Sequence, residues 1–104
     1  MSQVIYDVNL TVERVIADEF ARWLHPHIQT MVNLRGFMEA QWFEVTSTSN
    51  TVEWCVQYRL ESQEAYEHYI TNEAPKMRGD GLQRFGDRFE ATRRLLVTKE
   101  RFER

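Results

Sequence analysis

VIYDVNLTVERVIADEFARWLHPHIQTMV, residues 4–32, decides the fold because its apolar period changes near Arg14. Before Arg14, apolar and polar side chains alternate, which is typical of a strand with one buried face. The apolar positions are Val4, Tyr6, Val8, Leu10 and Val12. After Arg14, apolar residues recur at steps of three and four, which predicts an amphipathic helix over residues 15–32. The helical stripe is Ile16, Phe20, Trp23, Leu24, Ile28 and Met31.

Pro26 lies inside this predicted helix. Proline has no backbone N–H to donate to the carbonyl of the preceding turn. We therefore expect a kink or a break near His25, and the helix should end before Gly36.

Two strands rich in aromatic and β-branched residues follow, at residues 37–48 and 51–61. Ser49 and Asn50 lie between them, which predicts a hairpin. The second strand has one apolar face, formed by Val52, Trp54, Val56, Tyr58 and Leu60. Its other face is mainly polar.

The last part of the chain predicts two helical segments and a final strand. Ser62 is placed to cap the first segment. Pro75 suits the first turn of the second segment, which extends to Phe85 and is weakened by glycines in its middle. Gly86 suits its C-terminal cap. Residues 89–98 then alternate again as a strand.

The predicted order, β-α-β-β-α-β, defines an α+β fold of the ferredoxin-like, split βαβ type. This arrangement has a four-stranded antiparallel sheet of order 4-1-3-2, with both helices on one face. We expect the central pair of strands to be the one parallel exception. A chain of 104 residues is expected to form a single domain, residues 1–104.

Composition restricts the class of protein. The chain is 42% hydrophobic and 28% charged, as is ordinary for a globular protein. No apolar run approaches the roughly 20 residues that cross a bilayer, so we expect no membrane partner. Cys55 is the single cysteine, which fits a reducing compartment and offers no zinc site. We expect a cytoplasmic protein with no metal and no cofactor.

Charge is distributed unevenly along the chain. Residues 1–75 carry four basic and eleven acidic side chains, whereas residues 76–104 carry nine basic and five acidic ones. Pairing between neighbouring elements explains this most simply. The net charge of −3 argues against a nucleic-acid partner. The alternative is a small anionic ligand held by two or three arginines. The candidate ligand-binding residues are Arg78, Arg84, Arg88 and Arg93.

The sheet face away from the helices is expected to be partly apolar. Its polar candidates are Asp7 and Asn9, beside Gln57 or Arg59 on one side and Arg93 or Arg94 on the other. Its apolar candidates are Ile5 with Trp42 or Phe43, depending on register. An uncovered face of this kind is unusual on a small protein. A second copy is the simplest cover, so we expect a homodimer through the sheet face.

Several segments together resemble one protein family. They are residues 5–10 (IYDVNL), 23–24 (WL), 27–28 (HI), 36–37 (GF), 57–60 (QYRL), 74–78 (APKMR) and 84–89 (RFGDRF), followed by Arg93 and Arg94. The chain resembles, over nearly its whole length, the bacterial domain-of-unknown-function family 4286, and RFGDRF is the most specific part. The resemblance implies a small cytoplasmic protein of the dimeric α+β barrel type, with no agreed biochemical activity.

The wider dimeric α+β barrel group includes cofactor-independent monooxygenases and haem-degrading enzymes. Their sites lie between sheet and helices and use a strand asparagine, a tryptophan and a helix histidine. Asn9, Trp54 and His68 are residues of these kinds. Asn9 belongs to a polar strand face and Trp54 to an apolar one, so we expect that they do not converge on one cavity. Fold analogy alone does not establish chemistry.

Three functions follow as hypotheses. The first is a noncatalytic homodimeric module that binds a small ligand or a protein partner. The second is a monooxygenase-like or isomerase-like enzyme with a cavity between sheet and helices. The third is a small-anion sensor that uses the arginine-rich segment. The ligand would be small and either anionic or apolar. The pocket candidates are Trp23, Trp54, Tyr66, Tyr69 and Phe85.

Overall fold

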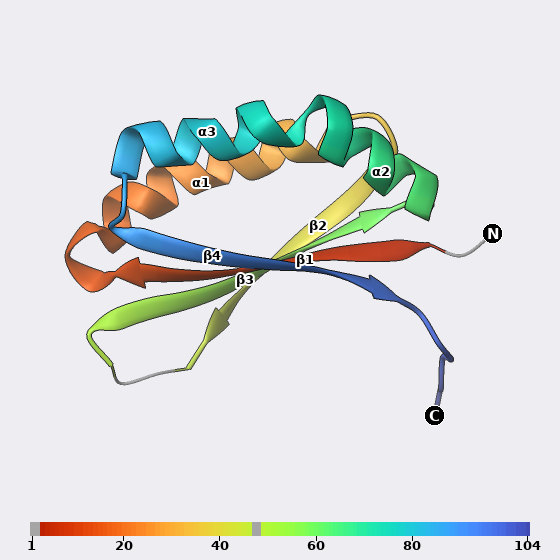
Figure 1. The fold of residues 1–104 in the computed structure, drawn as a ribbon. Coiled ribbons are helices and arrows are strands. Elements are labelled where there is room, and N and C mark those ends of the chain that lie inside the picture. Colours follow the sequence, from red (N-terminus) through yellow and green to blue (C-terminus); the bar gives the residue numbers. More distant parts are fainter. Residues whose placement is uncertain (1–2, 47–48) are drawn as a thin grey trace.

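One sheet and one layer of helices make up the part of the chain that the computed structural model describes, residues 3–46 and 49–104. The elements are β1 (Val4–Glu13), a 3-10 turn (Arg14–Ile16), α1 (Ala17–Val32), β2 (Phe37–Val45), β3 (Thr51–Leu60), α2 (Gln63–Asn72), α3 (Ala74–Phe85) and β4 (Phe89–Val97). All three α-helices lie on one face of the sheet, and the other face is bare (Figure 1). No helix of the described residues is long and apolar enough to cross a bilayer.

Among the described strands, the sheet order is β2-β3-β1-β4, which confirms the predicted arrangement. Every neighbouring pair in it is antiparallel, including β1 with β3. The expectation that this central pair is parallel is therefore wrong. Helix α1 returns the chain, so that β1 and β2 run in the same direction. The hairpin then reverses the chain before β3 enters between them.

Of the kink or break expected near His25, the break is wrong, because helix α1 continues through Pro26. Pro26 and Arg22, whose carbonyl loses its helical partner, both lie on the exposed side of the helix. Water can satisfy that carbonyl there. On the opposite side, Phe20 and Leu24 are buried in the core, and this packing stabilises the helix.

The predicted helix boundaries are mostly found at the expected residues. Ser62 Oγ accepts a hydrogen bond from the backbone N–H of Ala65 at 3.1 Å and caps α2. Pro75 lies in the first turn of α3, and Gly86 ends that helix with a φ of 60°. Helix α1 begins at Ala17, later than predicted, because a 3-10 turn replaces its first turn.

The hairpin between β2 and β3 agrees with the prediction over its described part. Strand β2 ends at Val45. The predicted end of this strand at Thr48 lies outside the described residues. Ser49 and Asn50 precede β3, as expected.

The main hydrophobic core lies between the sheet and the helices. Even-numbered residues of β1 face this core, and Leu10, for example, lies opposite Trp54 of β3 and Ala91 of β4. Phe20 of α1 is fully buried, with ring centroids 4.7 Å from Phe85 and 4.9 Å from Phe89. Burial of such large side chains supplies most of the stabilisation.

The strand registers also define the bare face, called the open face below. It carries Glu39, Gln41, Phe43 and Val45 of β2, Thr51, Glu53, Cys55, Gln57 and Arg59 of β3, Ile5, Asp7, Asn9, Thr11 and Glu13 of β1, and Glu90, Thr92, Arg94 and Leu96 of β4. The register therefore places Phe43 rather than Trp42 on this face.

Candidate functional site

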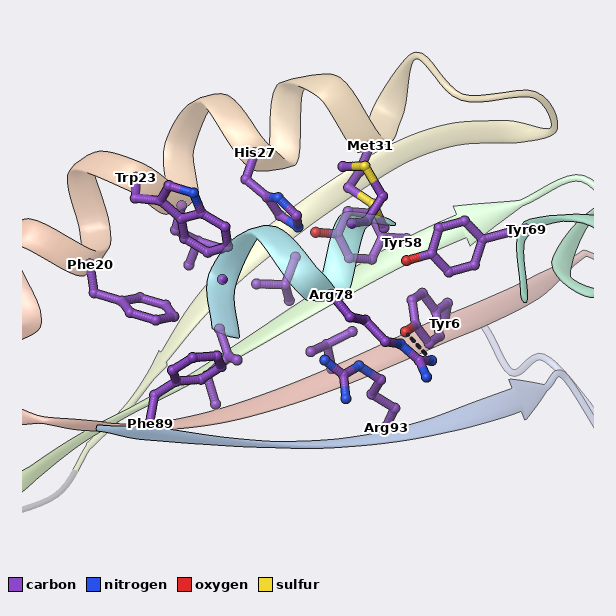
Figure 2. Close-up of a pocket in the computed structure, with 16 residues that line it drawn as sticks. Tyr6, Phe20, Trp23, His27, Met31, Tyr58, Tyr69, Arg78, Phe89 and Arg93 are labelled. Carbon is purple, nitrogen blue, oxygen red and sulfur yellow. Dashed lines mark hydrogen bonds between the residues drawn. The ribbon is translucent and has the colours of Figure 1, made fainter. Parts of the chain in front are cut away.

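A cavity of about 50 Å³ lies between the sheet and helices α1 and α3 (Figure 2). All three α-helices and three of the four described strands contribute to its wall. The lining residues are Tyr6, Val8, Leu10, Phe20, Trp23, Leu24, His27, Met31, Val56, Tyr58, Tyr69, Met77, Arg78, Gly81, Phe89 and Arg93. The wall is thus apolar except for phenol hydroxyls, one imidazole, one indole N–H and two guanidinium groups.

Strand parity explains why one arginine of β4 reaches the cavity and its neighbour does not. Arg93 pairs with Val8 in the register and so shares the helix-covered face. Arg94 pairs with Asp7 and lies on the open face. The sequence left Arg93 and Arg94 as alternatives for the open face, and the register places Arg94 there.

The polar end of the cavity is built around Arg78 of α3. Its Nη2 donates a hydrogen bond to the hydroxyl oxygen of Tyr6 at 3.1 Å. Its Nε is buried and has no acceptor among the described residues. Neither Arg78 nor Arg93 pairs with a carboxylate in the described part of the chain. A buried donor without an acceptor is costly, so this end of the cavity favours an anionic acceptor.

Tyrosine rings surround the same end. The Tyr6 centroid lies 5.9 Å from that of Tyr58, 5.5 Å from Tyr66 and 5.4 Å from Tyr69. Burial, reinforced by the neighbouring Tyr6, raises the pKa of both Tyr58 and Tyr69 above the ordinary value. These two phenols therefore stay neutral and keep their O–H donors at physiological pH.

The other end of the cavity is aromatic. Figure 2 shows Phe20, Trp23 and Phe89 toward one end and Tyr6 and Arg78 toward the other. The indole of Trp23 is stacked on the imidazole of His27, one helical turn later, with 4.5 Å between ring centroids and 27° between planes.

Burial lowers the pKa of the His27 imidazole; the charge of Asp80 opposes the shift and that of Arg93 adds to it. The lowered pKa keeps the ring neutral near pH 7. His27 therefore adds a neutral polar group to the cavity and no positive charge.

The structure brings together four of the predicted site residues in this cavity. They are Arg78 and Arg93 from the anion-binding set and Trp23 and Tyr69 from the pocket set. The other two arginines lie elsewhere. Arg88 Nε donates to Glu13 Oε1 at 3.1 Å, and Arg84 lies over the Phe85 ring at 5.6 Å from its centroid.

The remaining pocket candidates pack in the core around the cavity without lining it. Trp54 Nε1 donates to Glu44 Oε1 at 3.2 Å, and its ring packs edge-on against Trp42. Tyr66 packs against Tyr6. Phe85, at the end of α3, packs against Phe20.

Sequence reasoning missed Tyr6, Tyr58, His27 and Gly81 as lining residues. The two tyrosines lie on strand faces that read as core from their period. A signal was present, because a buried phenol needs a hydrogen-bond partner. Two such phenols on facing strands indicate a polar region inside the core.

A separate polar cluster lies at the centre of the open face, around Asp7. The carboxylate accepts hydrogen bonds from Arg94 Nε and Asn9 Nδ2 at 2.8 Å each, and from Gln57 Nε2 and Cys55 Sγ at 3.1 Å each. Burial by itself would raise the Asp7 pKa, but these donors outweigh it and lower the pKa to about 2. The cluster satisfies its members internally, as structural buried polar networks do.

The three residues that resemble an oxygenase site do not meet. Asn9 is on the open face and donates to Asp7, whereas Trp54 is on the helix-covered face. His68 contacts Asn72 on α2 and does not line the cavity.

The sheet order and the single helix layer define a ferredoxin-like α+β fold, which is similar to that of dimeric α+β barrel proteins. A mutant of SnoaB, a cofactor-independent oxygenase from Streptomyces nogalater, matches with a TM-score of 0.75 and 12% identity, over 100% of both chains. A protein from Deinococcus radiodurans, provisionally assigned as an antibiotic biosynthesis monooxygenase, matches with 0.74 and 13%, over 96% of both. A dimeric ferredoxin-like protein from an uncultured marine organism matches with 0.66 and 10%, over 98% of this chain and 100% of that chain.

At these identities the similarities establish the fold alone. No curated protein matches the chain in sequence. The sequence profile of the domain of unknown function DUF4286 matches residues 3–99. The chain therefore belongs to the DUF4286 family, and the resemblance stated from the sequence is confirmed.

Proposed function

We propose that this protein is a noncatalytic binding module for a small organic anion with an apolar body. The anionic group would accept hydrogen bonds from Arg78, and the body would lie among the cavity's aromatic side chains. The buried Nε of Arg78, which has no acceptor among the described residues, is the observation that carries this proposal. It combines the ligand-binding and anion-sensing hypotheses drawn from the sequence.

Arginine chemistry supports an oxyanion ligand. A guanidinium presents its N–H groups as a planar fork that matches a carboxylate, and such charge-assisted bonds are stronger than neutral ones. Arg78 uses Nη2 for its contact with Tyr6, and its buried Nε has no acceptor among the described residues. Arg93 adds a second positive charge at the cavity wall, and no carboxylate of the described residues neutralises either group.

We also propose that the module is a cytoplasmic homodimer through its open face. Phe43 and Val45 are 42% and 45% exposed on this face, although both are apolar. The similar marine protein is described as dimeric, which supports the same assembly here. A second copy would remove this apolar surface from water.

An enzyme is the second candidate, and the neutral His27 favours it. A neutral imidazole inside a cavity can accept a proton. Asn9, the strand asparagine considered from the sequence, is on the opposite face, which weakens the likeness to oxygenases. Mass spectrometry and NMR of a bound acid after incubation in air separate the two functions. An acid unchanged in both mass and NMR spectrum supports the module, whereas a product that has gained oxygen, or a rearranged product of the same mass, supports the enzyme.

The binding proposal is tested by thermal unfolding in the presence of small carboxylates and of inorganic phosphate. A ligand that binds only the native state must raise the melting temperature in a concentration-dependent way. We expect a saturable rise with a carboxylate, and roughly tenfold weaker binding in Arg78→Met, because a charge-assisted pair is lost.

Arg84→Met is the matched control, because Arg84 is also on α3 but does not line the cavity. It should bind as the wild type does. Absence of a shift with every anion, or equal losses in both variants, would show that Arg78 holds no ligand.

A further inference from the structure

A groove on the outside of the molecule adjoins the cavity between α1 and α3. The groove has a volume of about 320 Å³ and includes Pro26, Thr30, Lys76 and Asp80. Trp23, His27 and Met77 line both spaces, so these three side chains form the partition between them.

The two ends of the cavity differ in polarity and in their access to solvent. Arg93 lines it and is exposed, so the polar end borders solvent at the edge strand β4. Trp23 lies toward the opposite, aromatic end (Figure 2). A ligand with its anionic group at Arg78 therefore points its apolar end toward Trp23.

Gly81 holds the Trp23 ring in this position. A Cβ at Gly81 would lie 3.0 Å from Trp23 Cη2 and 3.4 Å from Phe89 Cζ. Glycine therefore lets α3 rest directly against the indole, and any larger residue would push against it. The indole is confined by Gly81 on one side and by the stacked His27 on another.

The cavity is small for a binding site. About 50 Å³ of space open to water-sized molecules holds no more than a few waters, because a single water needs at least about 10–15 Å³. Typical ligand pockets are several times larger. Only a carboxylate with a few carbon atoms fits while Trp23 stays in place.

We infer that the ligand is a short-chain monocarboxylic acid and that Trp23 is the side chain that limits its length. This inference rests on the proposed function. Among the described residues that line the cavity, Arg78 and Arg93 are the cations, and both lie toward its polar end, which suits one carboxylate. No described lining residue at the apolar end is cationic, so a second acidic group would be desolvated there without compensation.

The test is a calorimetric titration of the full chain with acetate, propionate, butyrate, valerate, hexanoate and octanoate, and with inorganic phosphate. In the wild type, affinity should rise by roughly fourfold per buried methylene up to butyrate or valerate and then fall. Phosphate should bind more weakly than the preferred acid.

Trp23→Leu should join the cavity to the groove and move the preferred acid to hexanoate or octanoate. Trp42→Leu is the matched control, since Trp42 packs on Trp54 and does not line the cavity. It should keep the wild-type preference. Gly81→Ala provides a change in the other direction, because the added methyl group reduces the cavity and should favour propionate over valerate.

The outcomes distinguish failure of this inference from failure of the proposed function. If the wild type binds no acid and no phosphate, the proposed function itself fails. If it binds acids but shows no dependence on length, or keeps its preference in both Trp23→Leu and Gly81→Ala, only the role of Trp23 is overturned. Should Trp23→Leu fail to fold, the Gly81→Ala profile decides alone. Preferred binding of phosphate would overturn the monocarboxylate class.

Discussion

Arg93 and Arg94 are neighbours in the sequence with different partners in the structure. Arg94 Nε donates to the buried Asp7 carboxylate at 2.8 Å. Arg93 lies on the other side of the sheet, in the cavity wall. Successive side chains of a strand point to opposite faces, so Arg94 contributes to the stability of the sheet and Arg93 to the candidate site.

The Asp7 cluster predicts a loss of stability in acid. The Asp7 pKa is about 2 in the folded protein, below its ordinary value of 3.8. A lowered carboxyl pKa contributes stability that is fully present above the ordinary value and is lost as the pH falls through the folded value. The difference corresponds to roughly 2 kcal/mol, lost between about pH 4 and pH 2.

Urea unfolding of the wild type and Asp7→Asn, at several pH values and one protein concentration, measures this effect. The amide does not ionise, so the variant should be less stable near neutral pH and should lack this part of the acid loss. Parallel pH profiles for the two proteins would contradict the role given to the Asp7 carboxylate.

Sequence patterns at single residues could predict part of the candidate site. Arg78, Arg93, Trp23 and Tyr69 were among the predicted residues and lie in one cavity. Arg84 and Arg88 could not be separated from them, because a charge run does not say which side chains turn inward. Tyr6 and Tyr58 were missed because alternation assigns them to the core.

Helix α3 contains two glycines with different roles. Gly81 is in contact distance of Trp23, whereas a Cβ at Gly79 would meet no atom within 4 Å. The sequence predicted only that both weaken the helix. Tertiary contact therefore explains Gly81, and Gly79 retains its ordinary cost in a helix interior.

Replacing Gly79 by alanine should raise the free energy of unfolding by about 0.5–1 kcal/mol, through helix propensity and the lower entropy of the unfolded chain. Gly81→Ala, the matched change two residues later, should lower it because the added Cβ would be crowded against the Trp23 indole, at 3.0 Å from Cη2. Urea denaturation of both variants checks this. A destabilised Gly79→Ala or a stabilised Gly81→Ala would contradict this assignment.

The order and type of the elements could be predicted, because period and caps specify them locally. Ser62, Pro75 and Gly86 have the roles expected of them. Two details were wrong for different reasons. Pro26 does not break α1, because packing of the buried helix face outweighs one lost hydrogen bond on the exposed side. The central strands are antiparallel, which depends on the path of the chain and not on local sequence.

The molecule as a whole has two unlike faces. The helices cover one side of the sheet and enclose the cavity, while the open face carries exposed apolar groups around the Asp7 cluster (Figure 1). The proposed dimer and the proposed binding site therefore use opposite faces. Dimerisation would leave the groove between α1 and α3 accessible.

Light scattering tests the assembly. The wild type should have about twice the mass of one 12.5 kDa chain. Phe43→Lys should shift it toward monomer, because a lysine ammonium on the open face would be desolvated in the dimer. Leu82→Lys, a change at a 59% exposed position on α3, should remain dimeric. A monomeric wild type, or identical behaviour of the two variants, would contradict a dimer through this face.

The binding proposal rests on Arg78, and NMR can observe its side chain directly. The measurement follows the Nε–H signal of Arg78 as butyrate is added to the full chain, with Arg84 Nε–H as internal reference. A carboxylate that accepts from Arg78 Nε should shift that signal saturably and slow its exchange with water, and the Arg84 signal should stay in place. An Arg78 signal that does not move, or one that moves only in parallel with Arg84, would contradict anion binding in the cavity.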